Sequence, residues 1–441
     1  MQKMKQLYIE TYGCQMNVAD SEVVASILAP QYAITDEPKT ADLILLNTCS
    51  VRDHAEQRIR KRLKELAVLK RANPTLLVGL LGCMAERIKE QLLQEEHTLD
   101  FIAGPDAYRT LPKLITEALL GTPVFNTMLS EQETYDDINP VRYDTNGVSA
   151  FISIMRGCNN FCTYCVVPYT RGRERSRNPE TIIREAQTLI NKGFKEVTLL
   201  GQNVNSYHWK TAEETVTFAK LVEQVALLSP KLRVRFATSH PKDISDELLN
   251  VIARYDNVCK HIHLPVQAGS TSTLNRMNRV YSREQYLERI AAIRRLLPDC
   301  AISTDIIAGF CGETEEEHQA TLSIMREAGY ASAYMFKYSV REGTTAAKRY
   351  ADDVPEAVKG ARLTEIIDLQ QQLSLEHNRR YLGQVTEVLI EGVSKRSQEE
   401  LFGRNSQNIV VIFPKGTHQK GDYVQVHVLE CSSATLRGEV V

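Results

Sequence analysis

The 441-residue sequence has no long uninterrupted run of apolar residues and no low-complexity tract. A membrane-spanning helix needs about 20 predominantly apolar residues, so we expect no membrane partner. Residues 1–5 also lack the apolar stretch and the small-residue cleavage site that begin a secretory signal. These absences predict a cytoplasmic protein.

The net charge is also small, because 53 Lys and Arg residues nearly balance 55 Asp and Glu residues and leave a formal charge of -2. A chain so close to neutral neither indicates nor excludes a nucleic-acid partner, and any basic binding surface must be local. The composition, 43% hydrophobic and 24% charged, is typical of a globular protein. The length predicts roughly three domains.

Cysteine is well represented, with ten residues. Disulfides are rare in a reducing compartment, so these cysteines are expected to be metal ligands, catalytic groups or small buried side chains. Four have no partner at the spacing of metal ligands and are expected to be buried apolar groups. These four are Cys259, Cys300, Cys311 and Cys431. The other six fall into two sets of three.

Residues 1–126 alternate apolar strands with amphipathic helices, which predicts an α/β domain with a parallel sheet flanked by helices. The expected strands span 6–11, 42–47, 75–81 and 100–103. Cys14, Cys49 and Cys83 each follow the end of one of the first three strands. Ligand sites in open parallel sheets lie at the carboxyl ends of the strands. We therefore expect the three thiols to converge at one edge of this sheet.

A polar segment without periodicity, 127–147, is predicted to be a linker. Residues 148–376 then repeat six strand-helix units, which predicts a partial (β/α)6 barrel with its chemistry at the strand carboxyl ends. The expected strands span 150–155, 196–200, 233–237, 261–265, 301–307 and 332–338, with helices beginning near Pro179, Thr215, Ile244, Ser282 and Glu313.

From 377 to 441 the apolar period changes to two, with expected strands at 385–390, 408–413 and 423–429. Turns that contain glycine separate these strands. This pattern predicts a small antiparallel β-barrel as the third domain.

Three cysteines, Cys158, Cys162 and Cys165, directly follow the first strand of the central domain. Three thiolates in one short loop can bind three irons of a cubane cluster and leave the fourth iron open. Zinc sites usually take four ligands in paired Cys-x-x-Cys form, so a structural zinc site fits poorly. The spacing, with Tyr164 just before the last cysteine, resembles the motif of the radical S-adenosylmethionine superfamily. In that superfamily the open iron binds S-adenosylmethionine, and its reductive cleavage generates a radical.

The same resemblance implies where the cofactor binds. Tyr164 would lie beside the adenine, and polar residues that follow the barrel strands would line the rest of the pocket. The expected lining residues are Gln202, Asn203, Ser239, Gln267 and Tyr338.

The whole chain resembles the methylthiotransferases, radical enzymes with a second cluster on an N-terminal domain and a C-terminal TRAM barrel. Three segments carry the N-terminal part of the resemblance, namely TYGCQMN (11–17), NTCSVR (47–52) and GCM (82–84). The run 156–177 and the strand-end segments 201–205, 263–267 and 303–307 extend it through the central domain. The family implies two [4Fe-4S] clusters, one auxiliary on Cys14, Cys49 and Cys83, and one on Cys158, Cys162 and Cys165.

Within this family, Gln15-Met16-Asn17 resembles the MiaB-like branch, which adds a methylthio group to C2 of N6-isopentenyladenosine at position 37 of tRNA. An aromatic C–H bond needs a radical for its activation, and the second open iron would hold the sulfur to be methylated and transferred. The resemblance implies two molecules of S-adenosylmethionine per turnover. Two alternatives keep the chemistry and change the substrate to threonylcarbamoyl-adenosine 37 or to a ribosomal-protein aspartate. An alternative of another class is a non-catalytic iron-sulfur or zinc RNA-binding protein.

The expected partners are the tRNA anticodon stem-loop, a one-electron reductant such as flavodoxin or ferredoxin, and the proteins that assemble clusters and supply sulfur. The protein itself is expected to be a monomer. Basic residues directly after the cluster loop and residues of the final barrel are the candidates for RNA contact. They are Arg171, Arg173, Arg175, Arg177, Phe402 and Arg404.

Overall fold

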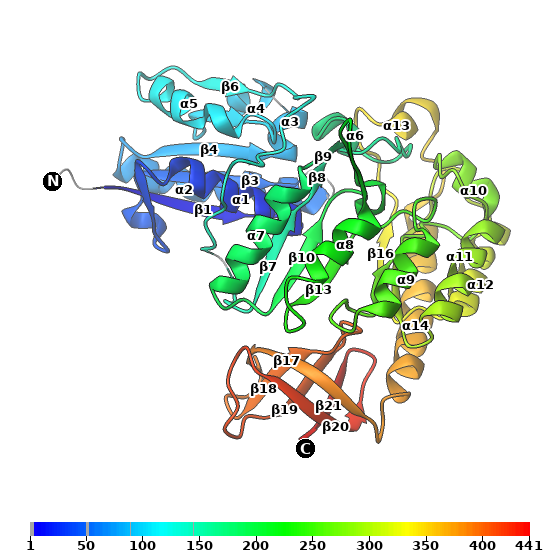
Figure 1. The fold of residues 1–441 in the computed structure, drawn as a ribbon. Coiled ribbons are helices and arrows are strands. Elements are labelled where there is room, and N and C mark those ends of the chain that lie inside the picture. The colour runs from blue at the N-terminus through cyan, green and yellow to red at the C-terminus, as the bar shows by residue number, and fades with distance from the viewer. Residues whose placement is uncertain (1–3, 50–52, 89, 144) are drawn as a thin grey trace. The chain divides into compact units, whose positions relative to one another are not determined.

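A computed structural model describes residues 4–49, 53–88, 90–143 and 145–441 (Figure 1). Ser50, Val51 and Arg52, which belong to one of the motif segments, lie outside the described residues. The chain divides into two compact units. The first comprises Met1–Asp144, Met155–Phe161 and Cys165–Thr181, and the second comprises Thr145–Ile154, Cys162–Tyr164 and Ile182–Val441.

The first unit is built on one parallel sheet with the strand order β2-β1-β3-β4-β5-β6. The strands are β1 (Lys5–Thr11), β2 (Tyr32–Ile34), β3 (Leu43–Thr48), β4 (Leu77–Gly82), β5 (Phe101–Ala103) and β6 (Val124–Asn126). The predicted parallel α/β domain is therefore confirmed. The sequence did not predict β2 and β6, which have three residues each.

Helices cover both faces of this sheet (Figure 1). They are α1 (Gln15–Leu28), α2 (Asp53–Ala72), α3 (Cys83–Ile88), α4 (Glu90–Glu95) and α5 (Leu111–Ala118). Alternate residues of β3 serve two cores, because successive side chains of a strand point to opposite faces. Leu43 and Leu45 pack in the core that contains α1 and α5, whereas Ile44 and Leu46 pack in the core that contains α2.

The segment 127–147 contains no helix or strand among its described residues, as expected for the predicted linker. Its described residues up to Tyr143 nevertheless belong to the first unit. Tyr135 is only 2% exposed, and its ring stacks on that of Tyr108 with centroids 5.6 Å apart. The hydroxyl of Ser26 donates to the carbonyl of Asn139 at 2.8 Å.

Six parallel strands form the frame of the second unit, in two three-stranded sheets ordered β13-β10-β7 and β14-β15-β16. They are β7 (Ser149–Ser153), β10 (Glu196–Leu200), β13 (Arg233–Ala237), β14 (His261–His263), β15 (Ala301–Ala308) and β16 (Ser332–Lys337). An isolated parallel bridge joins Val234 to Val258, just before β14. The predicted partial barrel is confirmed.

The helices of this barrel are α8 (Phe218–Ala226), α9 (Asp246–Arg254), α10 (Thr271–Arg276), α11 (Arg283–Leu296), α12 (Glu315–Ala328), α13 (Thr345–Arg349) and α14 (Glu356–Arg379), while α7 (Pro179–Asn191) runs across the boundary between the units. Capping boxes fix two of the starts, with Ser282 and Gln285 before α11 and Thr314 and Glu317 before α12. The helix expected from Thr215 begins three residues later, because 215–217 forms β12 (Thr215–Thr217) in a hairpin with β11 (His208–Lys210).

The C-terminal residues form a closed barrel ordered β17-β18-β19-β21-β20, which confirms the predicted β-barrel. The prediction that it is antiparallel throughout is wrong for one pair, because β19 and β21 are parallel. Its strands are β17 (Val385–Val393), β18 (Glu400–Arg404), β19 (Val410–Pro414), β20 (Tyr423–Cys431) and β21 (Thr435–Val440). Alternate residues such as Val424, Val426 and Val428 fill its core. The sequence predicted three of the five strands and missed β18 and β21. Among the described residues, no helix is both long enough and apolar enough to cross a membrane.

Candidate functional site

Cys14, Cys49 and Cys83 lie at the carboxyl ends of the adjacent strands β1, β3 and β4. Cys14 is the residue before α1, and Cys83 is the first residue of α3. The ends of β1 and β3 approach closely, because a Cβ added to Gly13 would lie 2.7 Å from the Cβ of Cys49. Gly13 has a φ of 142°, which favours glycine at this position. Cys49 and Cys83 are buried, and Cys14 is exposed.

Two amides hold these strand ends together. The thiol of Cys14 donates to Oδ1 of Asn17 at 3.3 Å, and Nδ2 of Asn17 donates to Oδ1 of Asn47 and to the carbonyl of Thr48, both at 3.1 Å. Nδ2 of Asn47 returns a hydrogen bond to the carbonyl of Asn17 at 2.8 Å. Both amides are 0% exposed. The Asn of the QMN segment, Asn17, therefore has a structural role, because it connects the start of α1, next to Cys14, to the end of β3.

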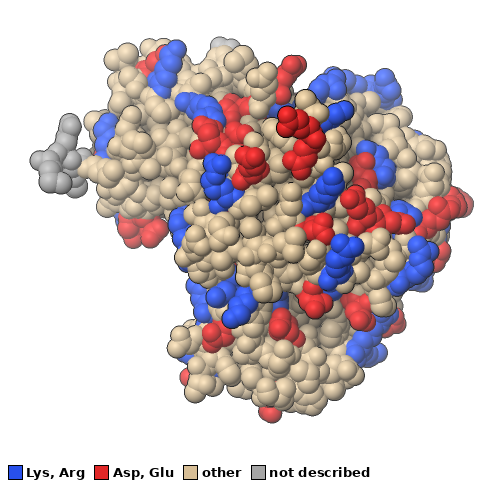
Figure 2. Space-filling model, viewed as in Figure 1, with Lys and Arg blue, Asp and Glu red and all other residues tan. Residues whose placement is uncertain are grey.

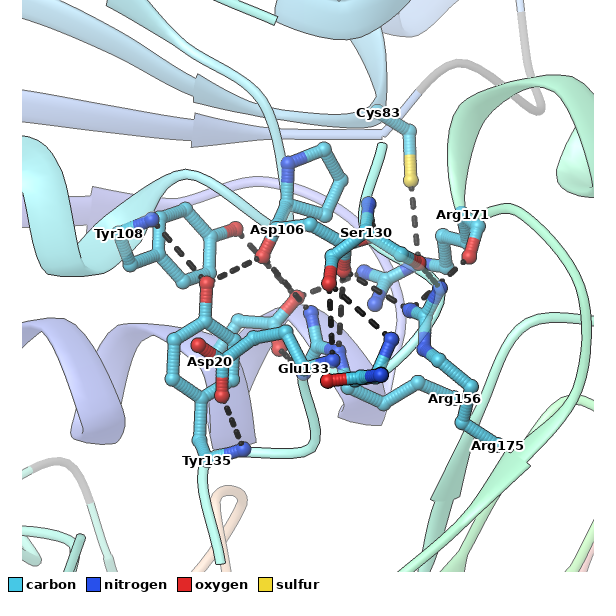
Figure 3. A network of polar contacts seen from close by, with 12 residues as sticks. Asp20, Cys83, Asp106, Tyr108, Ser130, Glu133, Tyr135, Arg156, Arg171 and Arg175 are labelled. Atoms are coloured by element: carbon cyan, nitrogen blue, oxygen red, sulfur yellow. Dashed lines mark hydrogen bonds and ion pairs between the residues drawn. The ribbon is translucent and has the colours of Figure 1, made fainter. Parts of the chain in front are cut away.

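The third cysteine, Cys83, meets an arginine from a distant part of the sequence. Nε of Arg171 donates to Sγ of Cys83 at 3.2 Å, and Nη2 of the same residue donates to Asp20 at 2.7 Å. The other oxygen of Asp20 accepts from Nη1 of Arg156, also at 2.7 Å. Figure 3 shows Arg171 between the thiol of Cys83 and this carboxylate. All of these residues belong to the first unit.

Burial and charge oppose each other in this network. Burial would raise the pKa of Asp20, but the charges and hydrogen bonds of Arg156 and Arg171 outweigh it and lower that pKa. Burial raises the pKa of the Cys83 thiol, and the charge of Arg171 opposes this rise. The ionised form of Asp20 is therefore favoured, and it pairs with two buried guanidinium groups.

A second buried carboxylate, Asp106, extends the network. Its Oδ1 accepts from Nη2 of Arg175 at 2.9 Å and lies 3.6 Å from Nε of Arg156. Arg175 also donates to the carbonyl of Ser130. The guanidinium of Arg156 lies over the ring of Tyr135, 4.9 Å from its centroid. The arginines that flank the cluster loop thus occupy internal positions.

These contacts correct the prediction that the whole run from Arg171 to Arg177 meets RNA. Arg171, Arg175 and Arg177 are 3%, 7% and 5% exposed, because their side chains turn inward to Asp20, Asp106 and Thr181. Arg173 alone among the four is exposed. On the face shown in Figure 2, basic and acidic side chains alternate without one continuous patch of either sign.

The loop with the second set of cysteines begins after β8 (Met155–Arg156), which pairs with β9 (Arg175–Ser176), and it leads into α6 (Val167–Thr170). Gly157 has a φ of 80°, and a Cβ there would lie 1.9 Å from the carbonyl oxygen of Arg173. The N–H of Cys158 donates to the carbonyl of Gly172 at 3.1 Å. The residues before β9 therefore pack directly against the first cysteine of the loop.

Cys162 belongs to the second unit, where a buried arginine contacts it. Nη1 of Arg279 donates to Sγ of Cys162 at 3.3 Å, and Nη2 donates to the carbonyl of Pro265 at 3.0 Å. Nε of Arg279 donates to the hydroxyl of Tyr281 at 2.9 Å. The sequence did not single out Arg279, because no local pattern distinguishes it from other helix-end arginines.

The chemistry of the donor sets fits iron-sulfur clusters, whose irons are held by cysteine thiolates. Within the described ranges, no three His, Cys, Asp or Glu side chains are arranged to hold one metal ion. Each set consists of three soft thiolates, and in each set an arginine N–H reaches one sulfur. The six cysteines as cluster ligands stay a prediction.

Buried polar atoms without hydrogen-bond partners gather past the carboxyl ends of the barrel strands. They are Oε1 of Gln202, Oδ1 of Asn203, both amide atoms of Asn205, Oγ of Ser239, Nε2 of His240 and the hydroxyl of Tyr338. An unsatisfied buried polar group costs about 1–3 kcal/mol, so native proteins rarely keep several in one region. A polar ligand with many donors and acceptors, as S-adenosylmethionine is, fits this set.

Four of these residues are ones that the sequence placed in the cofactor pocket. Tyr164 and Tyr338 both contact Phe310, with ring centroids 6.4 and 4.9 Å away. Gln267, also predicted, is 7% exposed and has a φ of 72°. Burial lowers the pKa of His240 to about 2, with smaller contributions from Arg279 and Lys242, so its imidazole is neutral. Asn205 was not among the predicted site residues, although it too follows β10.

Three family models match the chain in succession. Residues 6–104 match an uncharacterized protein family, UPF0004, residues 152–325 match the radical SAM superfamily, and residues 379–441 match the TRAM domain. The first range contains Cys14, Cys49 and Cys83, and the second contains the other predicted cluster cysteines.

Curated relatives match along nearly the whole chain. A tRNA-2-methylthio-N(6)-dimethylallyladenosine synthase of Bacteroides thetaiotaomicron is 58% identical over 439 residues, which cover 99% of this chain and 96% of the relative. The synthase of Amoebophilus asiaticus is 56% identical, with 99% and 92% of the two chains covered. The chain belongs to the tRNA-2-methylthio-N(6)-dimethylallyladenosine synthase family. The resemblance found in the sequence is thereby confirmed.

Solved structures agree with this family at the level of the fold. The radical S-adenosylmethionine methyltransferase TsrM of Kitasatospora setae, with cobalamin and a [4Fe-4S] cluster bound, aligns with a TM-score of 0.59. It is 13% identical, and the match covers 78% of this chain and 77% of TsrM. The cobalamin-dependent radical enzyme OxsB, with aqua-cobalamin and S-adenosylmethionine bound, aligns with a TM-score of 0.51 at 12% identity, over 83% and 56% of the two chains.

The TRAM barrel of this synthase family member carries the last two predicted RNA-contact residues, Phe402 and Arg404, on β18. Phe402 is half-buried, and the side chain of Arg404 is 37% exposed and paired with Glu391. The carbonyl of Arg404 accepts from Nη1 of Arg233 at 2.6 Å, so this strand end also attaches the TRAM barrel to the strands of the second unit.

Proposed function

We propose that the protein adds a methylthio group to C2 of N6-isopentenyladenosine at position 37 of tRNA. One observation carries this proposal, namely the match to named synthases over 99% of the chain, a range that includes both cysteine triplets. A base in the anticodon loop is unstacked or can be flipped, which suits an enzyme that must reach an atom inside the ring.

The cofactors are two [4Fe-4S] clusters and S-adenosylmethionine. We propose that Cys14, Cys49 and Cys83 hold the auxiliary cluster and that Cys158, Cys162 and Cys165 hold the other. When bound, the clusters and S-adenosylmethionine supply the radical, sulfur and methyl chemistry of the reaction.

The residues of the chain bind these groups, orient them and exclude water. The buried polar atoms of Gln202, Asn203, Ser239 and Tyr338 would satisfy the polar groups of S-adenosylmethionine. Asn17 and Asn47 would keep the start of α1, next to Cys14, in register with the end of β3. Because most of these groups are buried, they would limit the access of water to the reacting atoms.

tRNA is the substrate partner, and the TRAM domain is a candidate surface for it. We propose Arg173, Phe402 and Arg404 as contacts with the anticodon stem-loop and no longer include the three buried arginines. A flavodoxin-like or ferredoxin-like donor would supply single electrons, and assembly proteins would supply clusters and sulfur. We further propose that the protein is a cytoplasmic monomer.

Nucleoside mass spectrometry of tRNA tests this function. A strain that lacks the gene should lose the 2-methylthio form and accumulate N6-isopentenyladenosine, and the wild-type gene should restore the product. Cys83→Ala and Cys162→Ala should each fail to restore it. Cys431→Ala is the matched control, because this half-buried cysteine lies in the TRAM barrel and belongs to neither triplet.

Two outcomes would contradict the proposal. Persistence of the 2-methylthio form in the strain without the gene would remove the proposed substrate. Loss of the methylthio form of threonylcarbamoyl-adenosine instead would move the same chemistry to that nucleoside.

A further inference from the structure

Arg171 combines three features that an ordinary structural arginine does not need together. It is 3% exposed, its Nε donates to the sulfur of Cys83 at 3.2 Å, and its Nη2 donates to Asp20 at 2.7 Å. Its remaining nitrogen, Nη1, is buried and has no hydrogen-bond partner. The carboxylate of Asp20 thus fixes the guanidinium on one side, and Nε contacts the sulfur of Cys83. Nη1 keeps an N–H that no group accepts.

The carboxylate that fixes Arg171 also fixes Arg156. Asp20 is 1% exposed and accepts one charged hydrogen bond on each oxygen, from Nη1 of Arg156 and from Nη2 of Arg171. Arg156 stands two residues before Cys158, the first cysteine of the second triplet. One carboxylate in α1 therefore holds both the arginine that contacts Cys83 and the arginine that enters the other cysteine loop (Figure 3).

The ion pairs of the network contain more arginines than aspartates. Arg156, Arg171 and Arg175 pair with Asp20 and Asp106, and the guanidinium of Arg171 also lies against the sulfur of Cys83. Charges in a buried site are screened far less than charges on the surface. An anion beside Arg171 would therefore be stabilised. The sulfur of Cys83, which Arg171 contacts, marks the position of that anion.

We propose that Arg171 is a positioning residue that raises the reduction potential of the auxiliary cluster, and that Asp20 moderates this effect. The inference rests on the proposed function, because it takes Cys83 to be a cluster ligand. Hydrogen bonds to cluster sulfurs and the net charge around a cluster both set its potential. An N–H donor and a positive charge favour the more negative, reduced state, whereas a nearby carboxylate disfavours it.

The step concerned is the transfer of one electron to the oxidised cluster from an external donor, which is itself oxidised by one electron. Arg171 stays protonated throughout, because a guanidinium does not lose its proton in a protein. The electron alone changes the charge of the site.

A redox titration of the full chain tests the proposal. In a parent with Cys158, Cys162 and Cys165 all changed to Ala, only the auxiliary cluster can assemble, and dithionite reduction followed by EPR reports its midpoint potential. Arg171→Gln should shift that potential to a more negative value. Asp20→Asn should shift it to a more positive value, and Arg171→Lys, which keeps the charge, should shift it less than Arg171→Gln.

Arg109→Gln is the matched control, because Arg109 lies in the same unit and pairs with Glu133 and Asp137 but contacts no cysteine. It should leave the potential unchanged. General damage to the fold would move the Arg171 and Asp20 variants in the same direction, whereas the proposal requires opposite directions. If iron and sulfide are intact and the potentials of these variants equal that of the parent, the inference is wrong.

Iron and sulfide analysis separates this result from a failure of the proposed function. A folded parent that binds no iron would contradict the second cluster itself, and with it the inference. If Arg171→Gln alone loses its iron, Arg171→Lys and Asp20→Asn still decide the direction of the shift.

Discussion

Asn17 and Asn47 form a closed pair of buried amides behind the thiol of Cys14. Their hydrogen bonds join residues 30 positions apart in the sequence. A side chain of this kind contributes little net stability when paired, but its loss leaves the partner buried and unsatisfied.

Asn17→Ala should therefore destabilise the protein by about 1–3 kcal/mol, since Oδ1 of Asn47 and the carbonyl of Thr48 lose the donor that Nδ2 of Asn17 supplies. It should also lower the iron content after reconstitution, because the start of α1, directly after Cys14, loses its hydrogen bonds to the end of β3. Denaturant unfolding and iron analysis measure the two effects. Asn191→Ala, at an exposed end of α7, is the control and should change neither. Equal unfolding free energies for the two variants would show that the amide pair is dispensable.

The sequence located the cysteines but not the residues that position them. Cysteine spacing is local and can be found in a short loop, whereas Asp20 meets Arg156 and Arg171 across 136 and 151 positions. The same limit explains why the RNA contacts predicted for the arginines of 171–177 needed correction. Exposed and inward-facing arginines look alike in a sequence, and only the positions of Asp20 and Asp106 show that Arg171 and Arg175 are internal.

At the scale of elements, α14 is unusual because polar side chains make up most of its buried face. Lys359, Arg362, Gln370, Ser374 and His377 are all buried. His377 is 5% exposed, and neither of its ring nitrogens has a hydrogen-bond partner. Burial lowers the pKa of His377 to about 4, and the positive charges of Arg380 and Arg294 add to this effect.

This shift predicts acid sensitivity. The unfolded imidazole binds a proton below its ordinary pKa of about 6.5, while the folded one resists protonation down to about 4. Stability is therefore complete above pH 6.5 and falls between about pH 6.5 and 4, by at most about 1.4 kcal/mol per pH unit for one group. Below that window both states carry the proton.

His377→Gln should flatten the loss of stability between pH 7 and pH 5. His240 and His261, whose pKa values burial lowers to about 2 and about 3, keep part of the slope. Denaturant midpoints across this range measure the change. The exposed His208→Gln serves as the control, and a variant slope equal to that of the wild type would contradict the assignment.

Long elements were predictable from periodicity, and short ones only where an apolar run or the strand-helix alternation marked them. The six barrel strands and the five central helices were expected close to where they lie, and so were two strands of only three residues, β5 and β14. The three-residue strands β2, β6, β11 and β12 are too short to show a period. In the TRAM barrel, Gly403 and Gly438 interrupt the patterns of β18 and β21.

At the scale of the whole molecule, two arginines of β13 attach the TRAM barrel within the second unit. Nη2 of Arg235 donates to the carbonyl of Asn405 at 2.7 Å, and Nε donates to Glu196 at 2.7 Å. Arg233 reaches the carbonyl of Arg404, and the hydroxyl of Tyr423 donates to the carbonyls of Lys195 and Lys231, both at 3.1 Å. The attachment uses side chains from one domain and backbone from the other.

Arg235→Ala should loosen this attachment and leave the 8% exposed Glu196 side chain without its cation, at a cost of about 3–5 kcal/mol. Limited proteolysis should then release a C-terminal fragment faster than from the wild type. Arg254→Ala removes an exposed arginine, 65% accessible and paired with Glu223, and should leave the cleavage rate unchanged. Equal rates for both variants would show that other contacts hold the barrel.

The first unit is assembled from separated stretches of chain, and this has a consequence for biosynthesis. While the ribosome has released only Met1–Asp144, the sheet is complete in sequence, but Asp20 and Asp106 lack the arginines that neutralise them. Those arginines, Arg156, Arg171 and Arg175, are synthesised later. The nascent domain therefore reaches its final electrostatic balance only after both cysteine-bearing regions have been synthesised.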